Sequence, residues 1–209
     1  MTKQQTTETA QGGGVYTSGY VEQTQSLGEQ IGRLLQAGDV VAFYGDLGSG
    51  KTTMIQGLAK GLGFDPDRIK SPTFVLMREY PGSVPLIHID GYRLEGPAMV
   101  SWLDVEQVFS PSKITVIEWA ERFESLLPES TLVVRMEHVG SRQRRIRLEP
   151  ATERAKELIA KLPDALPEPP KPKKEKHSKY IPPDSEAEDK PDDDTQSETN
   201  AEQADVSGD

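Results

Sequence analysis

The sequence predicts an α/β domain built on a mostly parallel sheet, and three observations predict it. A short β-rich segment at residues 40–44 is followed by a glycine-rich loop and by a helical segment at residues 53–60. Two later apolar runs, residues 85–90 and 114–118, each end in a carboxylate. Two alternating segments then flank Gly140–Ser141, which predicts a late antiparallel hairpin. Because strands alternate with helices, we expect three layers, with the sheet in the middle.

The loop after the first strand matches the pattern G-x-x-x-x-G-K-[ST] completely. Glycines allow successive N–H groups to turn inward around phosphate oxygens, and the N-terminus of the next helix adds partial positive charge. Lys51 can then reach the β- and γ-phosphates, and the Thr52 hydroxyl can ligate a Mg²⁺ ion that bridges them. A chance match is disfavoured by the strand before the loop and the helix after it. We therefore expect a nucleotide site at Gly45, Asp46, Leu47, Gly48, Ser49, Gly50, Lys51, Thr52 and Thr53.

The two carboxylates that close apolar runs are Asp90 and Glu118. In a phosphate-loop fold the parallel strands end on the nucleotide side, so both acids can meet the magnesium shell opposite Thr52. There they can hold, orient or deprotonate an attacking water. We expect Thr52, Asp90 and Glu118 to bind metal, and Lys51, Asp90 and Glu118 to be catalytic. A turn or cap at Asp90, and a salt bridge at the sheet's rim for Glu118, are the plainer alternatives.

Several other side chains carry weaker signals. A strand is expected from Thr73 onward, so the hydroxyls of Ser71 and Thr73 either approach the γ-phosphate or belong to a plain turn. His88 is interpreted as a packed, hydrogen-bonded histidine rather than a catalytic one. Arg93 either stabilises phosphate or pairs with an acid. A basic face on the hairpin could contact tRNA phosphates, although a solvated strand face is favoured; it comprises Arg142, Arg144, Arg145 and Arg147.

Helices are expected on both sides of the phosphate loop in sequence. An apolar stripe after Thr24 predicts one capped by that threonine and ended by Gly38. Residues 98–109 and 120–127 predict short helices, and residues 152–162 predict a last helix that closes the domain.

Composition divides the chain into three parts. We expect a flexible leader at residues 1–18, the phosphate-loop domain at 19–162, and a disordered proline-rich acidic tail at 163–209. The tail holds 14 Asp and Glu against 6 Lys, so it carries most of the chain's net charge of −10. Cysteine is absent, which excludes disulfides and thiolate metal sites. No apolar run of about 18 residues is present, so we expect a soluble cytoplasmic protein without a membrane partner.

Four motifs together resemble the TsaE family, also called YjeE. They are the phosphate loop through Thr53, residues 70–74 (Lys-Ser-Pro-Thr-Phe), residues 88–93 (His-Ile-Asp-Gly-Tyr-Arg) and the pair Glu118–Trp119. The resemblance implies a small bacterial ATPase, using ATP and Mg²⁺, that is required for N6-threonylcarbamoyladenosine formation on tRNA. It implies TsaD and TsaB as protein partners, with tRNA met only indirectly through their complex. By the same analogy Thr52 and Glu118 hold Mg²⁺, Asp90 is the acid of the second nucleotide motif, and residues 71–73 act as a switch.

Three other functions use the same loop. A small-molecule kinase would need a substrate pocket and an arginine-bearing lid, for which no glycine-hinged basic segment is seen between the strands. A guanine-nucleotide switch would need an Asn-Lys-x-Asp segment, which the sequence lacks. A nucleotide-dependent scaffold, in which hydrolysis is incidental, is the non-enzymatic alternative.

Overall fold

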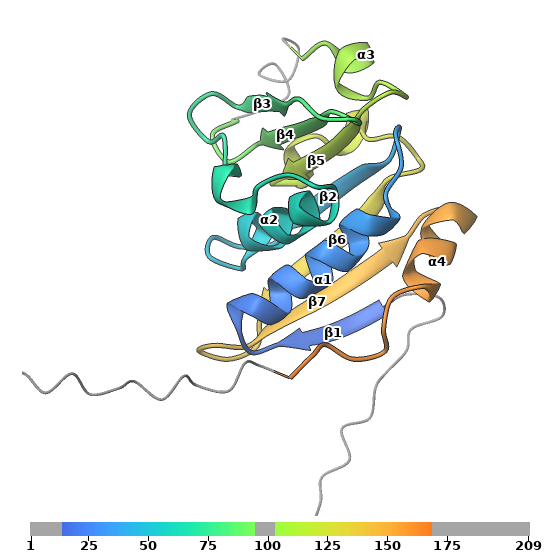
Figure 1. Cartoon of the computed structure of the whole chain (residues 1–209). Coiled ribbons are helices and arrows are strands. Elements are labelled where there is room, and N and C mark those ends of the chain that lie inside the picture. Colours follow the sequence, from blue (N-terminus) through green and yellow to red (C-terminus); the bar gives the residue numbers. More distant parts are fainter. Residues whose placement is uncertain (1–13, 95–102, 169–209) are drawn as a thin grey trace, which may run out of the picture. The chain divides into compact units, whose positions relative to one another are not determined.

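A computed structural model describes residues 14–94 and 103–168 of the chain. One sheet has the strand order β1-β7-β6-β2-β5-β4-β3 (Figure 1). Its strands are β1 (Gly14–Ser18), β2 (Val40–Tyr44), β3 (Met77–Tyr80), β4 (Leu86–Asp90), β5 (Ile114–Glu118), β6 (Leu132–His138) and β7 (Arg144–Pro150). The helices are α1 (Val21–Leu34), α2 (Lys51–Gly61), α3 (Val105–Val108) and α4 (Glu153–Ala160), with 3-10 turns η1 (Pro66–Arg68), η3 (Ala120–Arg122) and η4 (Glu124–Leu126).

The centre of the sheet is parallel, as predicted. Strand β2 lies between β5 and β6 and runs parallel to both, and β4 runs parallel to β5. Antiparallel pairs flank this centre, with β3 on β4 at one edge and the β6–β7 hairpin followed by β1 at the other. Every residue of β2, β4 and β5 is buried, which explains why the sequences of these strands are mainly apolar rather than alternating.

Side chains alternate between two apolar clusters, one on each face of the sheet. Val41 and Phe43 join the cluster beneath α1, α2 and α4, whereas Val40 and Ala42 join the one that contains residues of α3 and η3. This period of two is the normal geometry of a strand. Figure 1 shows α1 and α2 side by side over the first face, and the three-layer prediction is confirmed.

Glycines bring α1 and α2 into backbone contact. A Cβ atom on Gly57 would lie 2.1 Å from the carbonyl oxygen of Gln25, and one on Gly32 would lie 2.1 Å from that of Leu58. Real Cβ atoms never approach so closely, so larger side chains would push the helices apart. Because α2 begins at Lys51, this close packing also fixes the phosphate loop against the domain.

The beginning of the domain differs from expectation. Residues 14–18, assigned from composition to a flexible leader, instead form β1, in which Tyr16 and Ser18 are buried. Helix α1 begins at Val21, so the prediction that Thr24 caps it was wrong. Thr24 lies inside the first turn, where its hydroxyl is 2.7 Å from that of Ser18. The rest of the leader lies outside the described residues.

The prediction that a strand starts at Thr73 was also wrong. Residues 73–75 form a turn, Leu76 has a positive φ of 64°, and β3 begins only at Met77. A left-handed residue cannot continue a strand, which explains the late start. Phe74 is 83% exposed, so it fills none of the core that a strand here would use.

The expected later helices are partly confirmed. Helix α4 is capped by the Thr152 hydroxyl, which accepts a hydrogen bond from the Ala155 N–H at 3.3 Å. Residues 120–127 form two 3-10 turns rather than one helix. The helix predicted at 98–109 lies partly outside the described residues, and α3 is its described portion.

Residues 163–168 form no helix or strand, and the rest of the tail lies outside the description. No helix in the described ranges is long and apolar enough to cross a bilayer.

Candidate nucleotide-binding site

Three glycines set the path of the phosphate loop. Gly45, Gly48 and Gly50 have φ values of 141°, 76° and 101°, which side chains rarely adopt. A Cβ on Gly45 would also lie 2.2 Å from the carbonyl oxygen of Met136 on β6. The loop can therefore fold this tightly against the sheet only with glycine at its first position.

The phosphate loop and the start of α2 contain hydrogen-bond donors without a partner in the described chain. The Ser49 hydroxyl is buried and has no hydrogen-bond partner among the described residues. Gly50 is the N-cap of α2, and the first N–H groups of a helix have no intrahelical partner. Such a set of free donors at a helix N-terminus suits an anion, so the loop fits the phosphates of a nucleotide.

Lys51 is folded back onto its own loop. Its side chain donates hydrogen bonds to the carbonyl oxygens of Gly45 at 2.6 Å and Asp46 at 3.0 Å, and its Nζ lies 4.0 Å from the ring centroid of Trp119. The residue is only 4% exposed. Burial lowers the pKa of the Lys51 ammonium, and the negative charge of Glu118 opposes that change.

The loop and the end of β5 meet through Thr52 and Glu118. The Thr52 hydroxyl lies 2.9 Å from each carboxylate oxygen of Glu118, and Glu118 is only 3% exposed. His88 on β4 approaches the same carboxylate, with its Nε2 3.0 Å from Oε1. The structure therefore unites Thr52 and Glu118, and Glu118 pairs with a buried histidine rather than with a surface cation.

Asp90 lies in register with Glu118 on the neighbouring strand but has different partners. Its Oδ2 accepts hydrogen bonds from the hydroxyls of Ser71 and Thr73, the latter at 2.7 Å, and its Oδ1 accepts one from the Tyr92 N–H at 2.8 Å. No hydrogen bond joins Asp90 to Thr52 or Glu118 within the described chain. Asp90 thus anchors the segment that leads into the turn at residues 73–75. The turn predicted for Ser71 and Thr73 is therefore present, and their approach to the γ-phosphate stays a prediction.

The oxygen atoms of Thr52, Asp90 and Glu118 suit a hard cation such as Mg²⁺. No group of three or more His, Asp or Glu side chains gathers as a ready metal cage in residues 14–94 and 103–168. Mg²⁺ is normally held by one or two carboxylates together with substrate phosphates and water. The donor set fits a metal ion that arrives with a nucleotide.

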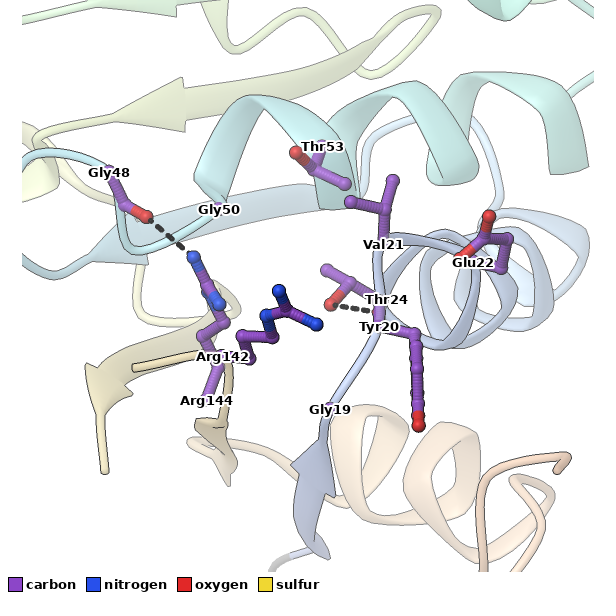
Figure 2. A pocket seen from close by; sticks show the side chains of 10 residues that line it. All are labelled: Gly19, Tyr20, Val21, Glu22, Thr24, Gly48, Gly50, Thr53, Arg142 and Arg144. Carbon is purple, nitrogen blue, oxygen red and sulfur yellow. Dashed lines mark hydrogen bonds between the residues drawn. The ribbon is translucent and has the colours of Figure 1, made fainter. Parts of the chain in front are cut away.

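A pocket of about 350 Å³ opens beside the phosphate loop. Figure 2 shows two arginines of the β6–β7 hairpin on one side of it and the start of α1 on the other. An Nη atom of Arg144 lies 3.5 Å from the Gly48 carbonyl oxygen and so connects the hairpin to the loop. The lining residues are Gly19, Tyr20, Val21, Glu22, Thr24, Gly48, Gly50, Thr53, Arg142 and Arg144.

Sequence reasoning missed the pocket. It assigned Thr24 to a helix cap and the arginines to a solvated or tRNA-facing strand, and it gave Tyr20 no role. No local motif marks these residues, because the start of α1 and the hairpin are far apart in sequence and meet beside the phosphate loop only through the sheet order. Arg93 stacks on Phe74, with its Cζ 4.3 Å from the ring centroid, and it forms no ion pair with an acid in the described part of the chain. A role of Arg93 toward phosphate stays a prediction.

Fold and loop together define a protein of the phosphate-loop class, whose loop suits the phosphates of a nucleotide. The family model for "Threonylcarbamoyl adenosine biosynthesis protein TsaE" matches residues 19–146. The chain belongs to this family, as its motifs predict.

Named relatives agree with this assignment. The TsaE protein of Treponema pallidum is 38% identical over 125 residues, which is 60% of this chain and 92% of that protein. The TsaE protein of a Nostoc species is 45% identical over 108 residues, covering 48% of this chain and 64%, slightly under two thirds, of the relative. The crystal structure of YdiB from Bacillus subtilis superposes with a TM-score of 0.60 at 29% identity, covering 71% of this chain and 92% of that one.

Proposed function

We propose that this protein is a Mg²⁺-dependent ATPase that serves N6-threonylcarbamoyladenosine modification of tRNA together with a TsaB–TsaD complex. The contact between Thr52 and Glu118 is the observation that carries the proposal. It joins the hydroxyl that follows the phosphate-loop lysine to a buried acid at a neighbouring strand end, where an ATPase needs a metal ligand. Family membership supports the role in tRNA modification, which is the process named for the curated relatives.

In this proposal the loop supplies binding and charge stabilisation. Free N–H groups at the start of α2 bind phosphate oxygens. Lys51 gives up its hydrogen bonds to the carbonyl oxygens of Gly45 and Asp46 and contacts the γ-phosphate instead. Thr52 and Glu118 would hold Mg²⁺, with Asp90 adjacent, and the ion would neutralise charge on the phosphates. Glu118 or Asp90 then orients the attacking water. Since Asp90 also accepts hydrogen bonds from Ser71 and Thr73, nucleotide binding can be transmitted to the turn at residues 73–75.

The pocket beside the loop is proposed to receive the nucleoside. It shares Gly48, Gly50 and Thr53 with the phosphate-binding segment, so a base there remains within reach of bound phosphates. Tyr20 offers an aromatic surface at the pocket's border, and Arg142 offers a planar cation. Tyr20→Ala should therefore weaken ADP binding more than it weakens inorganic phosphate binding.

Reconstitution with TsaB, TsaD and tRNA tests the proposed function. ATP turnover is measured for the complete mixture and with each component omitted, and modified tRNA is quantified in parallel. We expect slow turnover by the isolated protein and faster turnover with the complex. Glu118→Gln should retain nucleotide binding and lose turnover, whereas Glu153→Gln on the exposed side of α4 provides a matched control.

Two results would contradict the proposal. Turnover that is indifferent to every omission would argue against the partnership. Repeated modification cycles supported by a Glu118→Gln protein without hydrolysis would favour a nucleotide-dependent scaffold instead.

A further inference from the structure

His88 is a polar residue in the middle of an apolar strand. It lies on β4 opposite Val116 of β5 and is 0% exposed. It precedes Asp90 by two positions, so both side chains project from the same face of the sheet, as does Glu118 in register with Asp90. If His88 only filled space in the core, leucine could replace it without the loss of a hydrogen bond.

The hydrogen bond from His88 has a defined direction. A carboxylate that is to bind Mg²⁺ is ionised and only accepts, so in that state the Nε2 atom of His88, 3.0 Å from Glu118 Oε1, is the donor. The other ring nitrogen, Nδ1, is buried and has no hydrogen-bond partner in the described part of the chain. The ring therefore makes one directed hydrogen bond, and it makes it to Glu118.

Glu118 is consequently held from two sides. Thr52 contacts both of its oxygens from α2, and His88 contacts Oε1 from the adjacent strand. A metal ion that recruits the Thr52 hydroxyl would take that donor away from Glu118. The bond from His88 would then be the fixed one, since it comes from a fully buried residue within the sheet.

We propose that His88 is a positioning residue that holds the Glu118 carboxylate toward Thr52 and so prepares the site for Mg²⁺; this rests on the proposed function. His88 touches neither the nucleotide nor the ion. Outer partners of metal ligands typically contribute about 10- to 100-fold to metal affinity or activity.

A matched pair of amides tests the directed bond. His88→Gln places a side-chain N–H close to the position of Nε2, whereas His88→Asn places it near Nδ1 and cannot reach Glu118. His88→Leu removes the hydrogen-bond donor and places an apolar side chain of similar size in the buried position. Mg²⁺ is titrated against a fluorescent ADP analogue, and the affinity for the same analogue is measured in EDTA.

We expect the Mg²⁺ concentration that produces half of the change in analogue fluorescence to rise about tenfold or more in His88→Asn and His88→Leu. His88→Gln should remain within about threefold of the wild-type protein, since it keeps the donor. Affinity in EDTA should be equal for all four proteins. Circular dichroism and thermal unfolding set a common temperature at which every variant is folded, and the Gln–Leu pair suffices if the asparagine variant does not fold.

Equal Mg²⁺ responses in the leucine and wild-type proteins would overturn the inference, as would a glutamine variant as impaired as the leucine variant. These results would leave the proposed function intact. A wild-type protein whose nucleotide binding ignores Mg²⁺ would overturn the proposed function itself, and the role of His88 with it.

Discussion

The Thr52 hydroxyl lies 2.9 Å from both carboxylate oxygens of Glu118, although 66 positions separate the two residues in sequence. The contact joins the first turn of α2 to the end of β5, which is parallel to the strand that leads into the phosphate loop. A short polar side chain and a buried acid thus meet where the sheet ends, and the properties of this pair can be tested separately from those of the loop.

Thr52→Val removes the hydroxyl while keeping the shape of the side chain. We expect ATP turnover to fall about 100-fold or more, because the variant loses a proposed ligand of the Mg²⁺ ion that neutralises charge on the reacting phosphates. ADP affinity in EDTA should change little, since the loop amides and Lys51 remain. Thr52→Ser keeps a hydroxyl and is the matched control. Similar turnover in the valine and serine variants would show that the hydroxyl has no part in the reaction.

Gly45→Ala should both destabilise the domain and abolish nucleotide binding. Its φ of 141° is strained for alanine, and the new Cβ would lie 2.2 Å from the Met136 carbonyl oxygen. Strain and overpacking together should cost about 2–5 kcal/mol of unfolding free energy. Gly63→Ala is the control: Gly63 has a φ of 90° but nothing within 4 Å of the added Cβ, so about 1–2 kcal/mol is expected. Urea denaturation measures the unfolding free energy of both variants. An equal loss in the two variants would show that the contact with the Met136 carbonyl oxygen has no effect on stability.

Gly57→Ala tests the close packing between α1 and α2. Alanine alone favours the helix by about 1 kcal/mol, but its Cβ would lie 2.1 Å from the Gln25 carbonyl oxygen on α1. The obstacle is backbone, so α2 must move, and we expect a net loss of about 1–3 kcal/mol together with weaker ADP binding. Gly140→Ala in the hairpin turn is the control. The nearest atom to its added Cβ lies at 3.5 Å, so the loss of unfolding free energy should be less than about 1 kcal/mol. A stabilised Gly57→Ala protein would contradict the expected displacement of α2.

Elements with a strong local signal were predictable from sequence. The phosphate loop demands glycines at fixed positions, and the fully buried parallel strands β2, β4 and β5 read as mainly apolar segments. The expectation that Asp90 and Glu118 close adjacent strands is also confirmed by their register. Each of these features depends on residues close together in sequence or on one general rule of parallel sheets.

Features that depend on distant contacts were not predictable. Strand β1 exists because β7 offers it an edge, and nothing in its glycine-containing sequence reveals that partner. The turn at residues 73–75 interrupts a segment with good strand propensity, because the hydroxyls of Ser71 and Thr73 bind Asp90 instead. Whether Asp90 also binds metal stays a prediction. The pocket, likewise, is assembled from three segments that only the sheet order brings together.

Lys51 should make nucleotide affinity depend on pH in the alkaline range. Burial holds the pKa of its ammonium below the ordinary value of 10.5 in the free protein. Bound phosphates favour the charged form, so the pKa is higher in the complex than in the free protein. Affinity is then constant below the free-protein pKa and falls as pH rises from that value toward the pKa of the complex, by at most about tenfold per pH unit. Within this window ADP binding takes up a proton.

Calorimetric titrations with ADP between pH 7.5 and 10, in buffers of different ionisation enthalpy, measure both the affinity and the protons bound. Starting above pH 7 leaves the phosphate fully ionised, because its own last pKa is about 6. Lys51→Arg is the matched control, since a guanidinium keeps its charge across this range. Its affinity should be lower than that of the wild-type protein but flat with pH, without proton uptake. A wild-type affinity as flat as that of the arginine variant would mean that Lys51 stays fully charged throughout, and that the carbonyls of Gly45 and Asp46 with the ring of Trp119 outweigh the effect of burial.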